Sequence, residues 1–239
     1  KFVLFSAAVL LLVVALARPQ FGSKLKEVTR TGIELMLAVD VSNSMLAQDF
    51  EPSRLERTKF AIDRLTQQLE QDRIGLIVFA GDAYMQLPIT SDYVAARSFA
   101  AQISPTMVSK QGTAIGAAID LAASSFSSGS EGSRVIVVIS DGENHEDDAL
   151  AAAKAAAEKG IRIYTIGIGT PEGAPISIDG EFIKDEQGDM VVSKLDEQML
   201  EQIALTTGGA YIRATNRSLG LDEIVQKINE VEKKELTST

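Results

Sequence analysis

The sequence predicts a doubly wound α/β fold with a mainly parallel, Rossmann-like sheet. Apolar runs of strand length alternate with segments in which apolar residues recur at helical spacing. The apolar runs lack the two-residue alternation of half-exposed strands, which is typical of parallel strands buried on both faces. Alternating strands and helices imply right-handed crossovers, so helices should cover both faces of one sheet.

The predicted elements follow one another regularly along the chain, and no internal repeat is visible. Strands are expected at 33–41, 74–79, 84–89, 135–139, 161–168 and 210–214. Helices are expected at 55–69, 92–103, 115–126, 147–159, 195–203 and 221–231. The 84–89 strand reads as the one antiparallel edge strand, ended by Pro88. Ser91 or Asp92 is expected to cap the helix that follows it.

Residues 170–194 interrupt this alternation because they carry no helical pattern. Two short β-type runs flank Asp179-Gly180, a dipeptide typical of a tight hairpin turn. A second turn is expected at Gln187-Gly188-Asp189. The segment therefore reads as a small β-hairpin insertion. Because it leaves the carboxyl end of a parallel strand, we expect it beside any ligand site at that edge, as part of a partner surface.

The first residues form an apolar segment unlike the rest of the chain. Residues 2–17 are apolar except for Ser6, between Lys1 and Arg18. Sixteen helical residues span about 24 Å, slightly less than the apolar core of a bilayer. A signal peptide and a buried helix are alternatives, but a membrane helix is favoured. We therefore expect a transmembrane helix at 1–18, a linker at 19–30 and one domain at 31–236, with further residues preceding Lys1.

Composition excludes several classes of function. The chain has 239 residues and no cysteine, so it has no disulfides, no thiol catalysis and no cysteine-ligated metal. Its net charge is −10, and the residues after position 23 hold 21 basic and 33 acidic side chains, a net charge of −12. Such a domain repels nucleic acid, and we expect no nucleic-acid partner.

Oxygen-bearing side chains gather where three predicted strands or their loops end. Asp40 lies at the end of the first strand and Ser42 and Ser44 follow it, Thr113 precedes the 115–126 helix, and Asp141 follows the 135–139 strand. Ligands of open parallel sheets bind at this edge. Oxygen ligands suit hard cations such as Mg²⁺, with Mn²⁺ or Ca²⁺ as alternatives. Each residue alone also fits a turn or a helix cap, but together they predict one metal site.

These motifs resemble the metal-ion-dependent adhesion site of von Willebrand factor A (VWA) domains, in order and spacing over about residues 30–235. The resemblance implies that Ser42, Ser44 and Thr113 contact the metal directly. It implies that Asp40 and Asp141 bind the metal directly or through water. It further implies that the ion captures an acidic residue of a protein partner.

A narrower resemblance is to the Bat (Bacteroides aerotolerance) family, of the BatB type. It rests on Ala17-Arg18-Pro19-Gln20-Phe21, on Ile139-Ser140-Asp141-Gly142-Glu143-Asn144-His145, and on the segment from Arg213 to Leu221. This resemblance implies a bacterial inner-membrane protein whose VWA domain lies in the periplasm. Its expected partners are other Bat-family membrane proteins (BatA-like) and a MoxR-type AAA+ ATPase.

The sequence argues against an enzyme. The first strand is followed by neither Gly-x-Gly-x-x-Gly nor Gly-Lys-Ser/Thr, so the common nucleotide cradles are missing. His145 is the only histidine, and no Gly-x-Ser-x-Gly elbow is present. A metal-dependent hydrolase of the doubly wound class is the alternative hypothesis. We expect His145 to be a solvated loop residue.

Overall fold

The computed structural model describes residues 1–16, 32–127, 133–144, 146–178 and 180–237. The chain divides into two units, Lys1–Arg30 and Thr31–Thr239. The predicted linker at 19–30 and His145 lie outside the described residues.

The larger unit is built on a six-stranded sheet in the order β10-β5-β4-β1-β2-β3. Its strands are β1 (Glu34–Asp40), β2 (Arg73–Phe79), β3 (Ala83–Thr90), β4 (Arg134–Ser140), β5 (Arg162–Gly167) and β10 (Tyr211–Arg213). Only β3 runs antiparallel to its neighbour among these paired strands. The doubly wound, mainly parallel sheet with one antiparallel edge strand is therefore confirmed.

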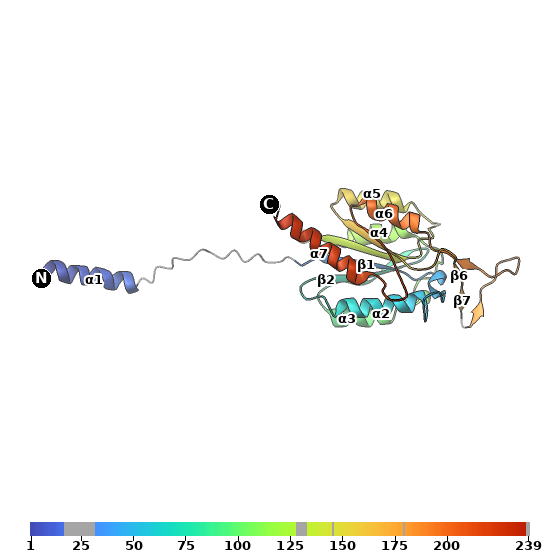
Figure 1. The fold of residues 1–239 in the computed structure, drawn as a ribbon, viewed down its shortest axis with the longest axis horizontal. Helices are drawn as coiled ribbons and strands as arrows, with labels where there is room; N and C mark the ends of the chain where they lie inside the picture. Colours follow the sequence, from blue (N-terminus) through green and yellow to red (C-terminus); the bar gives the residue numbers. More distant parts are fainter. Residues whose placement is uncertain (17–31, 128–132, 145, 179, 238–239) are drawn as a thin grey trace. The chain divides into compact units, whose positions relative to one another are not determined.

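Helices cover both faces of this sheet (Figure 1). One apolar core contains residues of α2 (Arg54–Thr66), α3 (Tyr93–Ala101) and α7 (Leu221–Thr237). The other contains residues of α4 (Ile115–Ser124), α5 (Ala149–Glu158) and α6 (Glu197–Thr206). Side chains of β1 alternate between the two cores, with Leu37 and Val39 in the first and Met36 and Ala38 in the second. This two-sided burial explains the unbroken apolar runs in the sequence.

Side-chain caps fix where several helices begin, and so fix the loops at the carboxyl edge of the sheet. Asp92 accepts hydrogen bonds from the backbone of Val94 and Ala95, so it is the cap of α3. Asp148 and Asp196 cap α5 and α6 in the same way. Each cap satisfies backbone N–H groups that a helix cannot satisfy internally.

The insertion forms two small antiparallel ladders. β6 (Ala174–Pro175) pairs with β9 (Val192–Ser193), and β7 (Ser177–Ile178) pairs with β8 (Glu181–Phe182). The predicted hairpin is confirmed, although Asp179 of its turn lies outside the described residues. The second predicted turn is present as well, because Gly188 donates its N–H to the carbonyl of Asp185.

Two predictions need correction. The edge strand continues through Pro88 to Thr90, because Pro88 is exposed and the pairing with β2 shifts register there, which spares the missing N–H. The apolar N-terminal segment forms a helix, α1 (Phe2–Leu16), but its 15 residues reach only about 22 Å. Across the described residues, no helix is both long and apolar enough to cross a membrane, so the structure does not support the predicted transmembrane helix.

The strand order changes direction beside β1. From β1 the chain proceeds to β2 and β3 on one side, and it then returns to form β4 and β5 on the other. The carboxyl ends of β1 and β4 therefore flank the switch point, where doubly wound sheets leave a crevice for ligands.

Candidate metal centre

Asp40 is the last residue of β1 and is completely buried. Its Oδ1 accepts the backbone N–H of Ser42 at 2.8 Å, which turns the chain sharply after the strand. A short 3₁₀ helix, η1 (Asn43–Leu46), follows. It brings the Oγ atoms of Ser42 and Ser44 within 2.9 Å of one another. The side chains of Asp40, Ser42 and Ser44 therefore gather at one place after β1.

The exit of β4 supplies the second carboxylate. Ser140 donates its hydroxyl to Asp40 Oδ2 at 2.7 Å, so the two strand ends are tied together by side chains. Asp141 follows and is also completely buried. Gly142 turns the chain with a φ of +81°, and a Cβ there would lie 2.3 Å from the carbonyl oxygen of Asp196. Only glycine fits this close approach without strain.

Thr113 reaches the same edge through its loop. The residue is 5% exposed and precedes α4. Next to it, Ala114 donates its N–H to the carbonyl of Ala80, just beyond β2. Gln111 Oε1 accepts the N–H of Asn43, which follows Ser42, at 3.1 Å. Thr113 is not the cap of α4, because Asn144 and Asp147 accept the first N–H groups of that helix instead.

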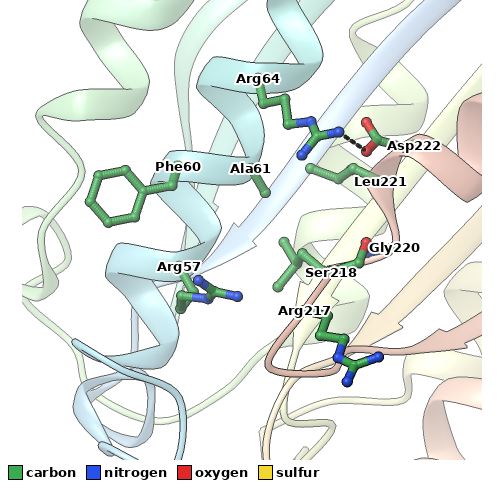
Figure 2. A pocket seen from close by; sticks show the side chains of 10 residues that line it. Arg57, Phe60, Ala61, Arg64, Arg217, Ser218, Gly220, Leu221 and Asp222 are labelled. Atoms are coloured by element: carbon green, nitrogen blue, oxygen red, sulfur yellow. Dashed lines mark hydrogen bonds and ion pairs between the residues drawn. The ribbon is translucent and has the colours of Figure 1, made fainter.

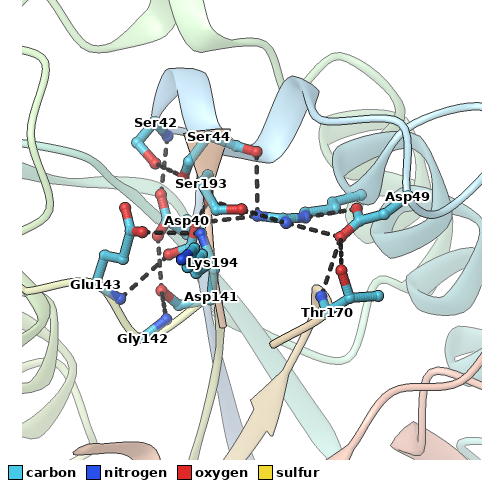
Figure 3. Close-up of polar contacts among 12 residues, drawn as sticks. Asp40, Ser42, Ser44, Asp49, Asp141, Gly142, Glu143, Thr170, Ser193 and Lys194 are labelled. Carbon is cyan, nitrogen blue, oxygen red and sulfur yellow. Dashed lines mark hydrogen bonds and ion pairs between the residues drawn. The ribbon is translucent and has the colours of Figure 1, made fainter. Parts of the chain in front are cut away.

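A buried arginine sits between the site and the insertion. Arg54, the first residue of α2, has no exposed surface. Its Nε and Nη2 bind the two oxygens of Asp49 at 2.8 Å each. Its Nη1 contacts Asp141 Oδ2 at 3.2 Å and Ser193 Oγ at 2.7 Å. Figure 3 shows Asp40 and Asp141 on one side of this network and Asp49 with Thr170 on the other.

The insertion touches the site directly. Ser193, the last residue of β9, donates its hydroxyl to Asp141 Oδ2 at 2.8 Å. Lys194 donates its backbone N–H to Glu143 Oε1 at 2.9 Å. At the start of the insertion, both the N–H and the hydroxyl of Thr170 bind Asp49 Oδ2 (Figure 3). The expectation that the insertion emerges at this edge is confirmed.

The electrostatics of the site are dominated by burial. Burial raises the pKa of Asp40 to about 7, and the negative charge of Asp141 adds to the rise, although hydrogen bonds from Ser42 and Ser140 oppose it. Burial also acts to raise the pKa of Asp49, but the hydrogen bonds and charge of Arg54 outweigh it and hold that pKa below its usual value. When ionised, Asp40, Asp141 and Asp49 carry three negative charges against the one positive charge of Arg54.

These residues fit a divalent cation. The net charge of the ionised cluster matches the charge of such an ion, and the available donors are all oxygens. Within the described parts of the chain, no three His, Cys, Asp or Glu side chains form a metal-binding group. A cation here would therefore rely on Ser42, Ser44 and Thr113 beside the two carboxylates.

All five residues predicted as ligands thus lie at one edge of the sheet. The prediction missed Arg54, Asp49 and Ser193. A signal for Arg54 was present, because it lies four residues before Thr58 and eight before Ile62, on the buried stripe of α2.

The fold and the site define a class of protein. The family model of the von Willebrand factor type A domain matches residues 34–227, so the chain belongs to that family. Within it, the chain is a Bat-family protein. It resembles BatB from Bacteroides thetaiotaomicron at 50% identity and a TM-score of 0.79, over 83% of this chain and all (100%) of that one. An aerotolerance-related membrane protein from Bacteroides fragilis matches at 52% identity and a TM-score of 0.80, over the same 83% and 100%.

Two further likenesses reach more widely. An uncharacterised protein of Borreliella burgdorferi is 31% identical over 85% of this chain, and the chain spans 60% of that relative's length. A mussel byssus protein, proximal thread matrix protein 1, shares only the fold. It is 15% identical with a TM-score of 0.61, over 84% of this chain and 46% of its own. Its solved structure holds zinc at its metal-ion-dependent adhesion site (MIDAS) motif.

Proposed function

We propose that this chain is a metal-dependent docking domain that captures a carboxylate of a protein partner. A divalent cation is held by Asp40, Ser42, Ser44, Thr113 and Asp141. Bound there, the ion supplies a positive charge, and an acidic side chain of the partner can complete its coordination.

One observation carries this proposal: two completely buried carboxylates, Asp40 and Asp141, meet at the switch point of the sheet with hydroxyl groups beside them. A buried carboxylate pair is costly unless a positive charge compensates it. Arg54 compensates in part, but it is shared with Asp49. Mg²⁺ held partly by neutral hydroxyl groups retains water at its remaining coordination positions, and an external carboxylate can replace that water.

Mg²⁺ is the proposed ion, with Mn²⁺ or Ca²⁺ as alternatives. Hydroxyl and carboxylate oxygens are hard ligands, and Mg²⁺ retains waters that a partner's carboxylate can replace. Zinc, seen in the distant mussel protein, more often binds nitrogen or sulfur ligands.

We place the protein at the bacterial inner membrane, with its VWA domain in the periplasm. The name of the Bacteroides fragilis relative, an aerotolerance-related membrane protein, supports a membrane location, and the resemblance to the Bat family suggests the inner membrane and the periplasm. The proposed partners are other Bat-family membrane proteins and a MoxR-type AAA+ ATPase, in an assembly related to aerotolerance or stress. The insertion is proposed to form part of the partner surface, because it borders the metal site through Ser193.

We further propose that the site does not catalyse a reaction. The two buried carboxylates of the site, Asp40 and Asp141, are the proposed ligands of the cation, and a carboxylate bound to a cation is a poor base. A hydrolase needs a base free to take a proton from water. Assays of phosphoester and ester hydrolysis, with and without Mg²⁺, should show no turnover above that of the Asp40→Ala variant.

The docking proposal is tested by capture from a membrane extract. The tagged chain is incubated with the extract in Mg²⁺ or in EDTA, and bound proteins are identified by mass spectrometry. We expect a partner retained in Mg²⁺, released by EDTA, and absent with Asp40→Ala. Asp120→Ala, which removes an exposed acid on α4, is the matched control and should retain it. A partner that binds equally in EDTA and to Asp40→Ala would show that the metal is not the docking point.

A further inference from the structure

A separate cavity of about 390 Å³ lies between α2 and the loop that leads into α7. Figure 2 shows Arg57 and Arg64 reaching from α2 toward this loop, which itself carries Arg217. Three guanidinium groups thus surround one cavity of a protein whose net charge is −10. None of these arginines belongs to the metal site.

The charges around the cavity are only partly balanced. Arg64 forms an ion pair with Asp222 at 3.5 Å, and its side chain is 71% exposed. Arg57 donates to the backbone carbonyl of Asn216, which leaves its charge uncompensated by that contact. Arg217 is exposed on the loop. The cavity lining therefore carries three positive charges and one negative charge, a local excess of positive charge.

Apolar groups complete the lining. Ala61, Leu219 and Leu221 line the cavity, and the two leucines belong to the buried core. Phe60 also lines it and is 60% exposed, although its aromatic ring is the kind of group that folding normally buries. An exposed aromatic ring beside arginines is a combination typical of protein-binding surfaces.

We propose that this cavity is a second, metal-independent docking site that binds an acidic peptide segment of a protein partner. Carboxylates of the segment pair with Arg57, Arg64 and Arg217, since guanidinium groups bind carboxylates in a two-pronged geometry. An apolar side chain next to those carboxylates contacts Ala61 and the leucines of the lining. The cavity's volume accommodates one or two side chains rather than a folded element.

The mixed lining favours a peptide over the other anionic ligands. A free phosphate would use the arginines but leave the apolar part of the lining, Ala61 and the two leucines, without a role. A membrane surface would face not only these arginines but also the domain's strong overall negative charge, which repels anionic lipids. A short acidic segment avoids most of that repulsion, because salt screens the protein charges that lie more than about 8–10 Å from it.

The test uses the 239-residue chain in EDTA, so that the metal site makes no contribution. The probe is a fluorescein-labelled hexapeptide, Glu-Glu-Leu-Phe-Glu-Glu, and the readout is fluorescence anisotropy. A peptide with glutamine in place of every glutamate, and inorganic phosphate as a competitor, are run in parallel. We expect the glutamate peptide to bind at least tenfold more tightly than the glutamine peptide, and more weakly as salt is raised.

Variants then locate the binding. Combining Arg57→Gln, Arg64→Gln and Arg217→Gln should weaken binding at least tenfold. Arg217→Gln alone, which removes a side chain exposed on the loop, should weaken it several-fold with the fold intact by circular dichroism. The matched control combines Lys110→Gln, Lys154→Gln and Lys159→Gln, three exposed lysines elsewhere, and should bind as wild type.

Three results would overturn the proposal. The first is equal loss of affinity in the arginine and lysine variants, which would indicate a general charge effect. The second is displacement of the peptide by phosphate at equal concentration, which would indicate a small-anion site. The third is loss of binding in Asp40→Ala, which would place the peptide at the metal centre; that variant should otherwise bind the peptide as wild type, even if the metal proposal is wrong.

Discussion

Replacing Arg54 by methionine should destabilise the domain far more than replacing any surface arginine. Arg54 donates six hydrogen bonds from a side chain with no exposed surface, and two of its partners are the carboxylates of Asp49 and Asp141. Methionine has a similar length but no charge, so it leaves both carboxylates without their cation. Removing one partner of a buried ion pair costs about 3–5 kcal/mol.

The measurement is urea unfolding in EDTA, followed by circular dichroism. With a slope of about 2 kcal/mol/M, a loss of about 4 kcal/mol lowers the midpoint by about 2 M. Arg64→Met is the matched control, because its ion pair with Asp222 is exposed and is worth about 1 kcal/mol or less. Arg54→Lys should restore little of the loss, since an ammonium cannot bind both oxygens of Asp49 as a guanidinium does. A midpoint for Arg54→Met within about 0.5 M of the Arg64→Met control would refute this reasoning.

Four further predictions concern the site and the insertion. Mg²⁺ must displace the proton from Asp40, whose pKa is about 7, so the Kd for Mg²⁺ measured by calorimetry should be about tenfold higher at pH 6 than at pH 8. Equal Kd values at the two pH values would contradict this prediction. Without metal, the raised pKa means that ionisation of Asp40 costs stability. Protonated Asp40 therefore makes its full contribution to the free energy of unfolding below about pH 4, and this contribution is lost as the pH rises through about 7. Asp40→Asn should flatten this part of the profile of unfolding free energy against pH. Gly142→Ala should lower the free energy of unfolding by more than about 3 kcal/mol, because its Cβ would meet the carbonyl of Asp196. Gly188→Ala should lower it by about 1 kcal/mol, because Gly188 has a φ of +89° but a Cβ there would meet nothing within 4 Å. Similar losses in the two variants would show that the close approach is unimportant. Removing residues 176–191 and joining Pro175 to its strand partner Val192 with two glycines should preserve Mg²⁺ binding but abolish partner capture, and unchanged capture would exclude the insertion from the partner surface.

The order of strands and helices was predictable because burial on both faces leaves its mark directly on the sequence. The apolar runs at β1 and β4 belong to strands that have a neighbouring strand on each side, so an unbroken apolar run is what such a central strand requires. The edge strand β3 was harder. Its pairing shifts register near Pro88, and a shift of this kind depends on the partner strand rather than on local sequence.

The ligand residues were predictable for a different reason. Asp40 lies at the end of one predicted strand and Asp141 follows another, and parallel strands place their carboxyl ends at one edge. Arg54 was missed because a charged residue at the start of a helix normally faces solvent. Its burial depends on Asp141 and Ser193, which lie 87 and 139 residues further along the chain. Pairings of this range follow from the fold and not from spacing.

The N-terminal segment shows the limit of composition as a guide. Its apolar run predicted a helix, and α1 is one. The prediction that this helix crosses a membrane is not supported, because no helix among the described residues is both long and apolar enough.

The central claim is that Asp40 and its neighbours hold a divalent cation. Isothermal titration calorimetry of the chain with Mg²⁺ at pH 8 tests it most directly. The account predicts one Mg²⁺ per chain for the wild type and for Asp120→Ala, and no measurable binding for Asp40→Ala with its circular dichroism spectrum unchanged. Mg²⁺ binding by Asp40→Ala with the wild-type affinity and stoichiometry would contradict it.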